Sequence, residues 1–380
     1  MKNVDLFYET QQHLTKNETV MLGSYYTPKH IIELAYNLIH KYIPNYKEYT
    51  ALDSSAGYGN FLTNSIFQRQ ITGEIDNFAL SVLQNNKAIE TYKKNALHNV
   101  SRKNYNLNDN EKLLIIGNPP YNDTTSHAKK EIKKDSELYE IDFDIKARDV
   151  GCSFLMSYNK LQADYVCVLH PLSYLIKKAN FNLLKTFKDN YQLIDGLVFS
   201  SQEFNKTSKN SQFPIIIGLY KKNSVGMNFE YITKYKFRTI DGKEFSLNNF
   251  DYIENYISKY PNKSNSSNIL FWTMRDINAL RRNKTFIKNS CANAVCVDRE
   301  SLAYYCYVDI FKKFTKHIPY YFGNLSIPID NKNFTALKDD FTNYSLQNYD
   351  FLKQHSSGNK FSLAKIEGYF QNLFSNHYVY

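Results

Sequence analysis

The chain predicts an α/β protein of two domains, because two different patterns follow one another along its 380 residues. Between residue 50 and about residue 220, short apolar runs alternate with helical patterns, which is typical of a mainly parallel sheet flanked by helices. After residues 221–226 the sequence becomes irregular and rich in Asn, Tyr and Lys. We therefore expect one domain over residues 1–225 and a second, mixed α+β domain over residues 226–380.

Six apolar runs predict the strands of the first domain. Polar or turn-forming residues bound each run, and helical patterns separate the early ones. The last two runs lie close together, so they can form an antiparallel hairpin at one edge of the sheet. The runs cover residues 49–52, 71–75, 113–116, 165–169, 193–199 and 214–220.

The composition indicates a folded, basic protein. Hydrophobic residues make up 43% of the chain and aromatic residues 16%, which excludes a largely disordered chain. Lys and Arg number 47 against 37 for Asp and Glu, and the net charge of +10 suits a polyanionic partner. A protein that is simply basic is the alternative.

The cysteines and the start of the chain indicate a reducing compartment. The five cysteines form no CxxC pair, which argues against a disulfide framework. Cys291, Cys296, Cys306 and His317 do not have the spacing of a common zinc finger, so we expect no metal and buried free thiols. The first residues lack an apolar signal-peptide core, and no stretch approaches the ~20 apolar residues of a membrane span. We expect a soluble, cytoplasmic protein that makes no membrane contact.

The segment after the first apolar run indicates a cofactor loop. It contains a Gly57-Tyr58-Gly59 turn, and glycines let the backbone turn tightly beneath a ligand. We expect a helix to start there and to present free N–H groups to a carboxylate or phosphate. Glu74 lies near the end of the second run, where a carboxylate can bind ribose hydroxyls. The alternatives are a plain turn and a helix-capping acid, a role that suits Asp76 better than Glu74.

The run at 113–116 leads into Gly117-Asn118-Pro119-Pro120-Tyr121, the most informative stretch of the chain. Two prolines stiffen the turn and fix the Asn118 side chain and the Pro119 carbonyl, two acceptors suited to the two N–H groups of an adenine N6 amine. They would stabilise the positive charge that develops on this weak nucleophile. Tyr121 can stack on a base extruded from the duplex. A purely structural turn is the alternative.

These segments together resemble the gamma group of S-adenosylmethionine-dependent DNA N6-adenine methyltransferases, which belong to restriction-modification systems. Residues 118–121 resemble their motif IV, residues 53–61 motif I, Glu74 motif II and residues 23–28 motif X. The order X, I, IV and then a recognition domain is that of the gamma group. The resemblance implies a Rossmann-like methyltransferase sheet, and it covers residues ~20–220 well and the remainder by position only.

The resemblance assigns site residues by position. Independently of the resemblance, Thr27 can cap and Pro28 can open a helix whose apolar positions fall on one face: Ile31, Leu34, Ala35, Leu38 and Tyr42. Ser54 and Tyr58 depart from motif I. Tyr220 or Phe213, in a segment resembling motif VIII, would bind the target base, and either ring can instead belong to the core. The implied cofactor-binding residues are Tyr26, Thr27, Pro28, Asp53, Ser54, Ala56, Gly57, Gly59, Asn60, Phe61, Glu74 and Asn95.

Two polar regions lack a motif. Residues 122–149 are dense in charge and are expected to form a long surface loop or, in their middle, a solvated helix face. The C-terminal region carries basic residues among aromatic ones, a pattern that suits phosphate contact but also an ordinary solvated surface. These residues are Arg275, Arg281, Arg282, Lys284, Lys312, Lys313 and Lys316, with Trp272, Tyr304, Tyr305, Tyr307, Tyr320 and Tyr321.

The sequence therefore predicts an enzyme that methylates N6 of an extruded adenine in double-stranded DNA, with S-adenosylmethionine as cofactor and a companion restriction endonuclease as a possible partner. The catalytic residues would be Asn118, Pro119, Pro120 and Tyr121. Two alternatives stay open. One is methylation of a protein glutamine, whose amide presents a similar amino group, and the other is a DNA-binding module with a decayed cofactor site.

Overall fold

The computed structural model describes residues 26–62, 67–121, 140–204, 212–261 and 268–380. The chain divides into two compact units, which we describe separately. The first comprises Met1–Asn210 and Ile215–Glu244, and the second comprises Ser211–Pro214 and Phe245–Tyr380. Residues 226–244 thus group with the first unit, because β8 (Phe237–Thr239) pairs with β6 (Tyr191–Ser200).

Nine strands of the described residues form one sheet, in the order β3-β2-β1-β4-β5-β7-β6-β8-β9. The strands from β3 to β5 are parallel, and β7 is antiparallel to β5. The α/β class with a large, mostly parallel sheet is confirmed. The strand bounds not yet given are β1 (Thr50–Asp53), β2 (Arg69–Glu74), β3 (Glu90–Lys93), β4 (Leu113–Gly117), β5 (Tyr165–Pro171), β7 (Pro214–Lys222) and β9 (Glu244–Phe245).

Two details of the sheet differ from the sequence prediction. The strands β6 and β7 are neighbours, but they are not at the edge, because β8 and β9 continue the sheet beyond β6. The edge strand β3 was missed. Its sequence, Glu90-Thr-Tyr-Lys93, is largely exposed and contains no apolar run of the kind that marks the buried strands.

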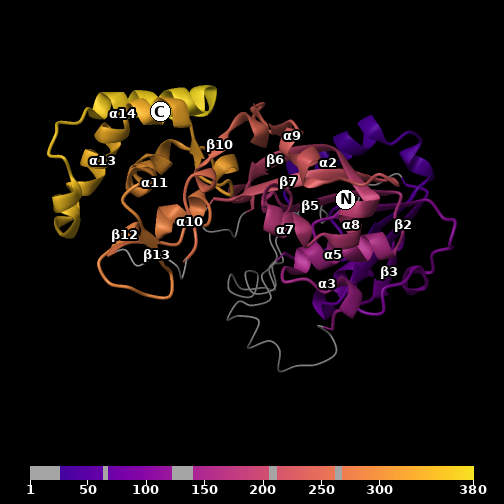
Figure 1. Cartoon of the computed structure of the whole chain (residues 1–380). Helices are drawn as coiled ribbons and strands as arrows, with labels where there is room; N and C mark the ends of the chain where they lie inside the picture. Colours follow the sequence, from indigo (N-terminus) through magenta and orange to yellow (C-terminus); the bar gives the residue numbers. More distant parts are fainter. Residues whose placement is uncertain (1–25, 63–66, 122–139, 205–211, 262–267) are drawn as a thin grey trace. The chain divides into compact units, whose positions relative to one another are not determined.

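Helices cover both faces of the sheet, with α2 (Lys29–Tyr42) on the opposite side from α5 (Val150–Lys160) (Figure 1). The α2 helix contacts β5 and β6. The other helices of this unit are α3 (Asn77–Leu83), α6 (Ser173–Ile176), α7 (Lys178–Asn182), α8 (Lys185–Asn190) and α9 (Phe229–Lys234), with 3₁₀ turns at Tyr46–Glu48, Arg102–Tyr105, Phe143–Ile145 and Ser201–Glu203.

The start of α2 corrects one expectation. Pro28, not Thr27, is the N-cap residue, and no side chain caps the helix. The expected face is buried at Ile31, Ala35 and Leu38, while Leu34 and Tyr42 are only half-buried. The pattern omitted Ile32 and Ile39, which widen the buried stripe.

The C-terminal unit combines short strands with helices, as expected of an α+β region. In the described residues it has a three-stranded sheet, β12-β11-β13, and the pair β10-β14. None of the helices in the described part of the chain has the length and apolar composition of a membrane span. The elements are β10 (Asp251–Tyr252), β11 (Ile269–Trp272), β12 (Phe286–Ile287), β13 (Ala294–Val297), β14 (Pro328–Ile329), α10 (Ile277–Arg282), α11 (Leu302–Phe314), α12 (Asn331–Ala336), α13 (Lys338–Leu346) and α14 (Leu363–Phe374), with 3₁₀ turns at Leu247–Asn249, Ile253–Asn255, Thr315–His317, Tyr320–Phe322, Asp350–His355 and Ser375–His377.

Candidate active site

The candidate site lies at the carboxyl ends of β2, β1 and β4, three adjacent parallel strands. Ligands bind at this edge in open α/β sheets, because the loops that leave the strands diverge there. The three strands end in Glu74, Asp53 and Gly117, and the Asn118–Tyr121 segment follows directly. The topology thus brings together the predicted glycine loop, the predicted ribose acid and the predicted catalytic segment.

Glu74 holds the glycine loop against the end of β2. One carboxylate oxygen, Oε2, accepts the Gly57 N–H at 2.7 Å, and Oε1 accepts the N–H groups of Ile75 and Asp76 at 2.7 and 2.9 Å. Burial raises the pKa of the Glu74 carboxyl, and the three N–H donors oppose that rise. The neighbouring Asp76 caps α3 through the Ala79 N–H at 2.8 Å, so the capping role falls to Asp76 as expected.

Asp53 lies beneath the start of the catalytic segment. Its side chain is buried, with 2% of the residue exposed, and Oδ1 accepts the Ser55 N–H at 3.2 Å. A Cβ atom on Gly117 would lie 2.6 Å from this Oδ1, so only glycine leaves room for the carboxylate. Burial raises the pKa of Asp53 to about 7, helped by the charge of Glu74 and opposed by the Ser55 N–H.

The glycine loop is a succession of turns. Gly57 and Gly59 have φ angles of 55° and 80°, in the left-handed region that favours glycine. The Ala56 N–H donates to the Gly73 carbonyl at 3.1 Å and ties the loop to β2. The helix expected after this loop would begin in residues 63–66, which lie outside the described part of the chain.

Two features of this loop fit a bound cofactor. The Ser55 hydroxyl oxygen is buried and has no hydrogen-bond partner among the described residues. A Cβ on Gly57 would have no atom within 4 Å, so there is open space above the loop. A buried polar atom without a partner is costly, and a ligand that hydrogen-bonds to Ser55 would remove that cost. A nucleotide-like cofactor with hydroxyl or amino groups therefore suits the loop.

The remaining motif I positions mainly shape the loop. Ser54, Ala56 and Phe61 are buried, and Asn60 is half-buried. The Phe61 carbonyl accepts the Tyr36 hydroxyl of α2 at 2.5 Å, so α2 and the loop are joined. Tyr58 packs its ring against Phe78 of α3, with ring centroids 6.3 Å apart.

The predicted catalytic segment is fixed at both ends. The Asn118 side-chain Nδ2 donates to the Thr27 hydroxyl oxygen at 3.1 Å, although the two residues are 91 positions apart. Pro119 and Tyr121 are buried, and Pro120 is half-buried. A Cβ on Gly151 in the first turn of α5 would lie 3.0 Å from the Tyr121 Cβ, so α5 packs closely against Tyr121.

A half-buried carboxylate supports the first turn of α5. Asp149 accepts the Gly151 N–H at 3.0 Å and also the Tyr174 hydroxyl. The Tyr174 ring stacks on His170, with ring centroids 5.4 Å apart. The His170 Nε2 lies 2.6 Å from the hydroxyl of Tyr220, and burial lowers the pKa of His170 to about 4. This imidazole is thus neutral near pH 7.

The two candidates for base binding lie in different environments. Tyr220 is 0% exposed in β7 and is bonded to His170, so its ring belongs to the core of the sheet. Phe213 precedes β7 directly and is half-buried. The placement favours Phe213 over Tyr220 as an accessible ring. Tyr26, a predicted cofactor contact, is also half-buried and precedes α2.

Asn95 occupies the expected place just after β3, but its amide is engaged with the backbone. Oδ1 accepts the Leu97 N–H at 2.9 Å, and Nδ2 donates to the Glu140 carbonyl at 2.8 Å. Nearby, Asp142 accepts the N–H groups of Asn99 and Val100. Of the polar segment 122–149, residues 122–139 lie outside the described part of the chain, whereas Glu140 and Asp142 belong to this local network.

Three solved structures resemble the chain at low similarity. One, from Pyrococcus horikoshii, is described as an RNA methyltransferase, with a TM-score of 0.36, 15% identity and coverage of 53% of this chain and 89% of that one. A second, from Listeria monocytogenes, is described as a class I S-adenosylmethionine-dependent methyltransferase, with a TM-score of 0.41, 16% identity and coverage of 57% and 66%. The third is the methyltransferase subunit of a type I restriction-modification system from Streptococcus thermophilus, with a TM-score of 0.40, 13% identity and coverage of 77% and 54%.

All three are described as methyltransferases. The alignment spans just over half of the Streptococcus thermophilus subunit. Identities of 13–16% with TM-scores of 0.36–0.41 are too low to transfer a substrate or an activity. No family model and no curated protein matches the chain.

The basic residues of the C-terminal unit fall into two groups. Arg281 donates to the carbonyls of Thr315 and Ile318, and Lys312 donates to the Asn283 carbonyl, so both support the local fold. The others are exposed: Arg275, Arg282, Lys284, Lys313 and Lys316. Of the aromatic residues, Tyr305, Tyr307 and Tyr321 are buried, whereas Trp272, Tyr304 and Tyr320 are half-buried.

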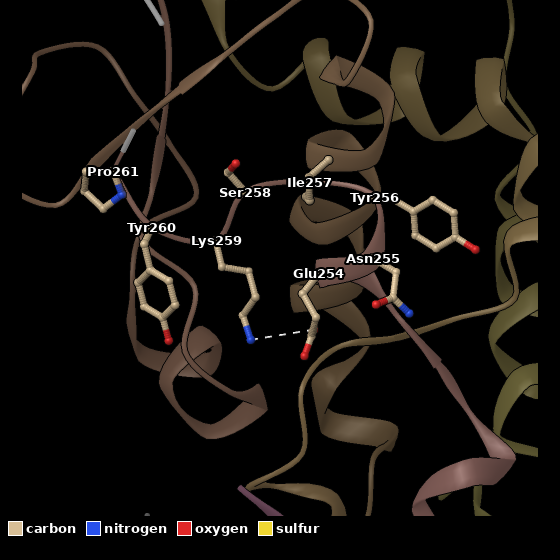
Figure 2. A pocket seen from close by; sticks show the side chains of 8 residues that line it. All are labelled: Glu254, Asn255, Tyr256, Ile257, Ser258, Lys259, Tyr260 and Pro261. Atoms are coloured by element: carbon tan, nitrogen blue, oxygen red, sulfur yellow. Dashed lines mark ion pairs between the residues drawn. The ribbon is translucent and has the colours of Figure 1, made fainter. Parts of the chain in front are cut away.

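A separate open pocket of about 660 Å³ lies in the C-terminal unit (Figure 2). One continuous segment, residues 254–261, lines it. Lys259 pairs with Glu254 at 3.7 Å and donates to the Ser326 hydroxyl at 2.9 Å and the Arg275 carbonyl at 3.2 Å. The Lys259 ammonium group is already engaged by these three contacts. The pocket therefore provides no readily available cation for an anionic ligand.

The cysteines match the expectation in part. Cys152, Cys167 and Cys306 are buried free thiols, but Cys291 is exposed and Cys296 is half-buried, because both lie near the ends of the short strand β13. In the residues that the structure describes, no group of three or more His, Cys, Asp or Glu side chains is arranged to hold a metal ion.

The sequence reasoning missed the residues that make the site compact. Gly117 ended the apolar run, and a glycine at the end of a strand is a signal of close approach. A Cβ on Gly73 would lie 2.9 Å from the Tyr105 ring, which packs beneath the loop. Burial, with the charges of Asp53 and Glu74, raises the pKa of Tyr105 well above its usual value. No sequence signal pointed to Tyr105, Gly151 or Asp149.

Proposed function

We propose that the protein is an S-adenosylmethionine-dependent methyltransferase that modifies the N6 amine of adenine in DNA. One observation carries the proposal. The Asn118–Tyr121 segment leaves the carboxyl end of β4, next to the strand ends that carry Asp53 and Glu74. A cofactor over the glycine loop and an amine held by Asn118 would therefore be neighbours. Placing two reactants side by side can supply much of a rate enhancement.

The cofactor would supply a methyl group activated by its attachment to a sulfonium sulfur. Glu74 is the proposed ribose contact, because a carboxylate oxygen can accept two hydrogen bonds and Oε2 uses one for Gly57. Ser55 would hydrogen-bond to the cofactor through its buried hydroxyl. Asp53 would then have a supporting role. Its carboxylate fixes the turn at Ser55 and packs closely against the backbone of Gly117.

Asn118 and Pro119 would bind the target amine. The Asn118 Oδ1 and the Pro119 carbonyl would accept its two N–H groups and stabilise the positive charge that grows on nitrogen as the N–C bond forms and the sulfonium S–C bond breaks, leaving a neutral thioether. The extra proton leaves afterwards to solvent, so no strong general base is required. Tyr121, beside α5, provides a ring for the extruded base.

The proposed DNA contact lies in the C-terminal unit. Its exposed arginines and lysines can bind phosphates, while half-buried Trp272, Tyr304 and Tyr320 can approach bases. The motif order supports our proposal that the protein belongs to the gamma group, with double-stranded DNA as its substrate and a companion restriction endonuclease as its partner. Glu74, Gly57 and Ser55 retain a well-formed loop, which argues against a decayed cofactor site.

The decisive experiment is incubation of the protein with methyl-labelled S-adenosylmethionine and mixed-sequence duplex DNA, followed by digestion to nucleosides. Label in N6-methyladenine is the expected result. Label in a methylated cytosine, or in a glutamine side chain of added protein but not in DNA, would contradict the substrate. Calorimetry with the cofactor alone completes the test, because a decayed site would give no heat.

A further inference from the structure

The resemblance treats Thr27 as a cofactor contact, but its side chain is engaged elsewhere. Its hydroxyl oxygen accepts the Asn118 Nδ2–H at 3.1 Å. The residue is 4% exposed, so water does not compete effectively for this bond. Thr27 does not cap α2 either, because Pro28 holds that position and no side-chain hydrogen bond caps the helix.

We propose that Thr27 is a positioning residue that sets the orientation of the Asn118 amide for the methyl acceptor. This inference rests on the proposed function, since it gives Asn118 its catalytic role. The amide group is planar and its oxygen and nitrogen lie on opposite sides of the Cγ atom. A donor bond from Nδ2 to Thr27 therefore directs Oδ1 away from Thr27. A rotation by half a turn would present N–H groups to the amine, and two donors cannot bind each other.

The surroundings of Thr27 make it a rigid reference point. It directly precedes Pro28, whose ring restricts the backbone before α2. The α2 helix is anchored on the sheet through its buried stripe, and the Tyr36 hydroxyl ties it to the Phe61 carbonyl of the glycine loop. The Thr27 hydroxyl that orients Asn118 thus belongs to the same segment as α2, which also contacts the glycine loop. The α2 segment therefore supports both the catalytic segment and the proposed cofactor loop.

The hydroxyl, not the size of the side chain, should matter. Thr27→Val keeps the shape of the side chain and removes the acceptor, whereas Thr27→Ser keeps the hydroxyl and removes a methyl group. Thr50→Val is a matched control, because Thr50 is a threonine that is as buried as Thr27. Thr50 begins β1, at the end of the strand away from the candidate site, and its hydroxyl donates to Glu111 at 2.5 Å. Glu111 also pairs with Arg69 at 3.0 Å, so we expect its carboxylate to remain paired in that variant.

The test measures single-turnover methyl transfer to DNA and calorimetric affinity for S-adenosylmethionine. For Thr27→Val we expect the rate to fall about tenfold or more, with cofactor affinity unchanged within about twofold, because the lost bond acts on the transition state. Thr27→Ser should keep most of the rate, and Thr50→Val should behave as the parent. Calorimetry also shows that each variant is folded.

The outcomes separate the two proposals. A parent protein that methylates no adenine refutes the proposed function and, with it, the role of Thr27. A parent that methylates adenine while Thr27→Val keeps its full rate overturns the positioning role alone. If Thr27→Val weakens cofactor affinity but leaves the rate at saturating cofactor unchanged, Thr27 is a cofactor contact, and the positioning role is overturned. Equal losses in the Ser and Val variants would indicate packing and would also overturn the inference.

Discussion

Polar groups serve different purposes at the carboxyl edge of the sheet and on the C-terminal unit. At the edge, Asp53 and Glu74 are buried and each is aligned by backbone N–H donors. In the C-terminal unit the buried acid Asp309 accepts the hydroxyl groups of Thr285, Ser345 and Tyr349, and the basic side chains are mostly exposed. The proposed catalysis would therefore depend on a few fixed groups at the sheet edge, whereas the proposed DNA contact would be spread over several exposed side chains of the C-terminal unit.

The largest effect is expected for Asn118→Ala at the edge. It removes an acceptor needed mainly as charge develops, and loss of one such group typically costs about 10²–10³-fold in rate. Cofactor affinity should stay within a few fold of the parent. Retention of more than a tenth of the parent rate in the labelled-methyl assay would contradict the role of Asn118.

The second test concerns stability and pH at Asp53, whose folded pKa is about 7 against an ordinary 3.8. The folded state therefore binds this proton more tightly, so its contribution to stability is present below pH 4 and is lost as the pH rises to about 7. At ~1.4 kcal/mol per pKa unit, the upper bound is about 4 kcal/mol.

Asp53→Asn should remove this decline. Urea unfolding of the parent and the variant between pH 4 and pH 8 measures it, and their difference isolates Asp53 from the other titrating groups. Parallel stability curves for the two proteins would show that the carboxyl ionises normally.

Glu74→Ala should have the next largest effect. Loss of the ribose acceptor is expected to weaken cofactor binding by about 1.5–3 kcal/mol, the range for hydrogen bonds to a charged group. Glu74→Gln is the control, since it keeps an acceptor and should lose less. Calorimetry that gives the parent affinity for the Ala variant would remove Glu74 from the cofactor site.

The smallest single effects are expected in the C-terminal unit. Lys284→Ala should weaken DNA binding uniformly across sequences and reduce the slope of log K against log salt by about one. Lys353→Ala is the control, because that exposed lysine already pairs with Asp350 at 2.5 Å. A salt slope that is unchanged for Lys284, Arg282 and Arg275 alike would place the DNA contact elsewhere.

The sheet was largely predictable, because buried parallel strands are marked by uninterrupted apolar runs. The runs at 113–116 and 165–169 match β4 and β5 closely. Strand β3 escaped prediction, since an exposed edge strand has no such run. The turns of the glycine loop were expected from Gly57 and Gly59, which both have left-handed φ angles.

The candidate site was predictable residue by residue but not contact by contact. Motif order located Thr27, Asn118 and Glu74, yet nothing in the order shows that Thr27 bonds to a residue 91 positions away. Tyr220 illustrates the same limit. Its place in a strand suited either the core or the base pocket, and only the packing against His170 distinguishes them.

The contact between Asp53 and Gly117 also restricts how this sequence can change over evolution. A Cβ at position 117 and a carboxylate at position 53 claim the same space, with 2.6 Å between them. We therefore expect a larger residue at position 117 to be tolerated only after Asp53 has been replaced by a residue with a shorter side chain. Among homologous sequences, these two sites should therefore covary, although 64 positions of chain separate them.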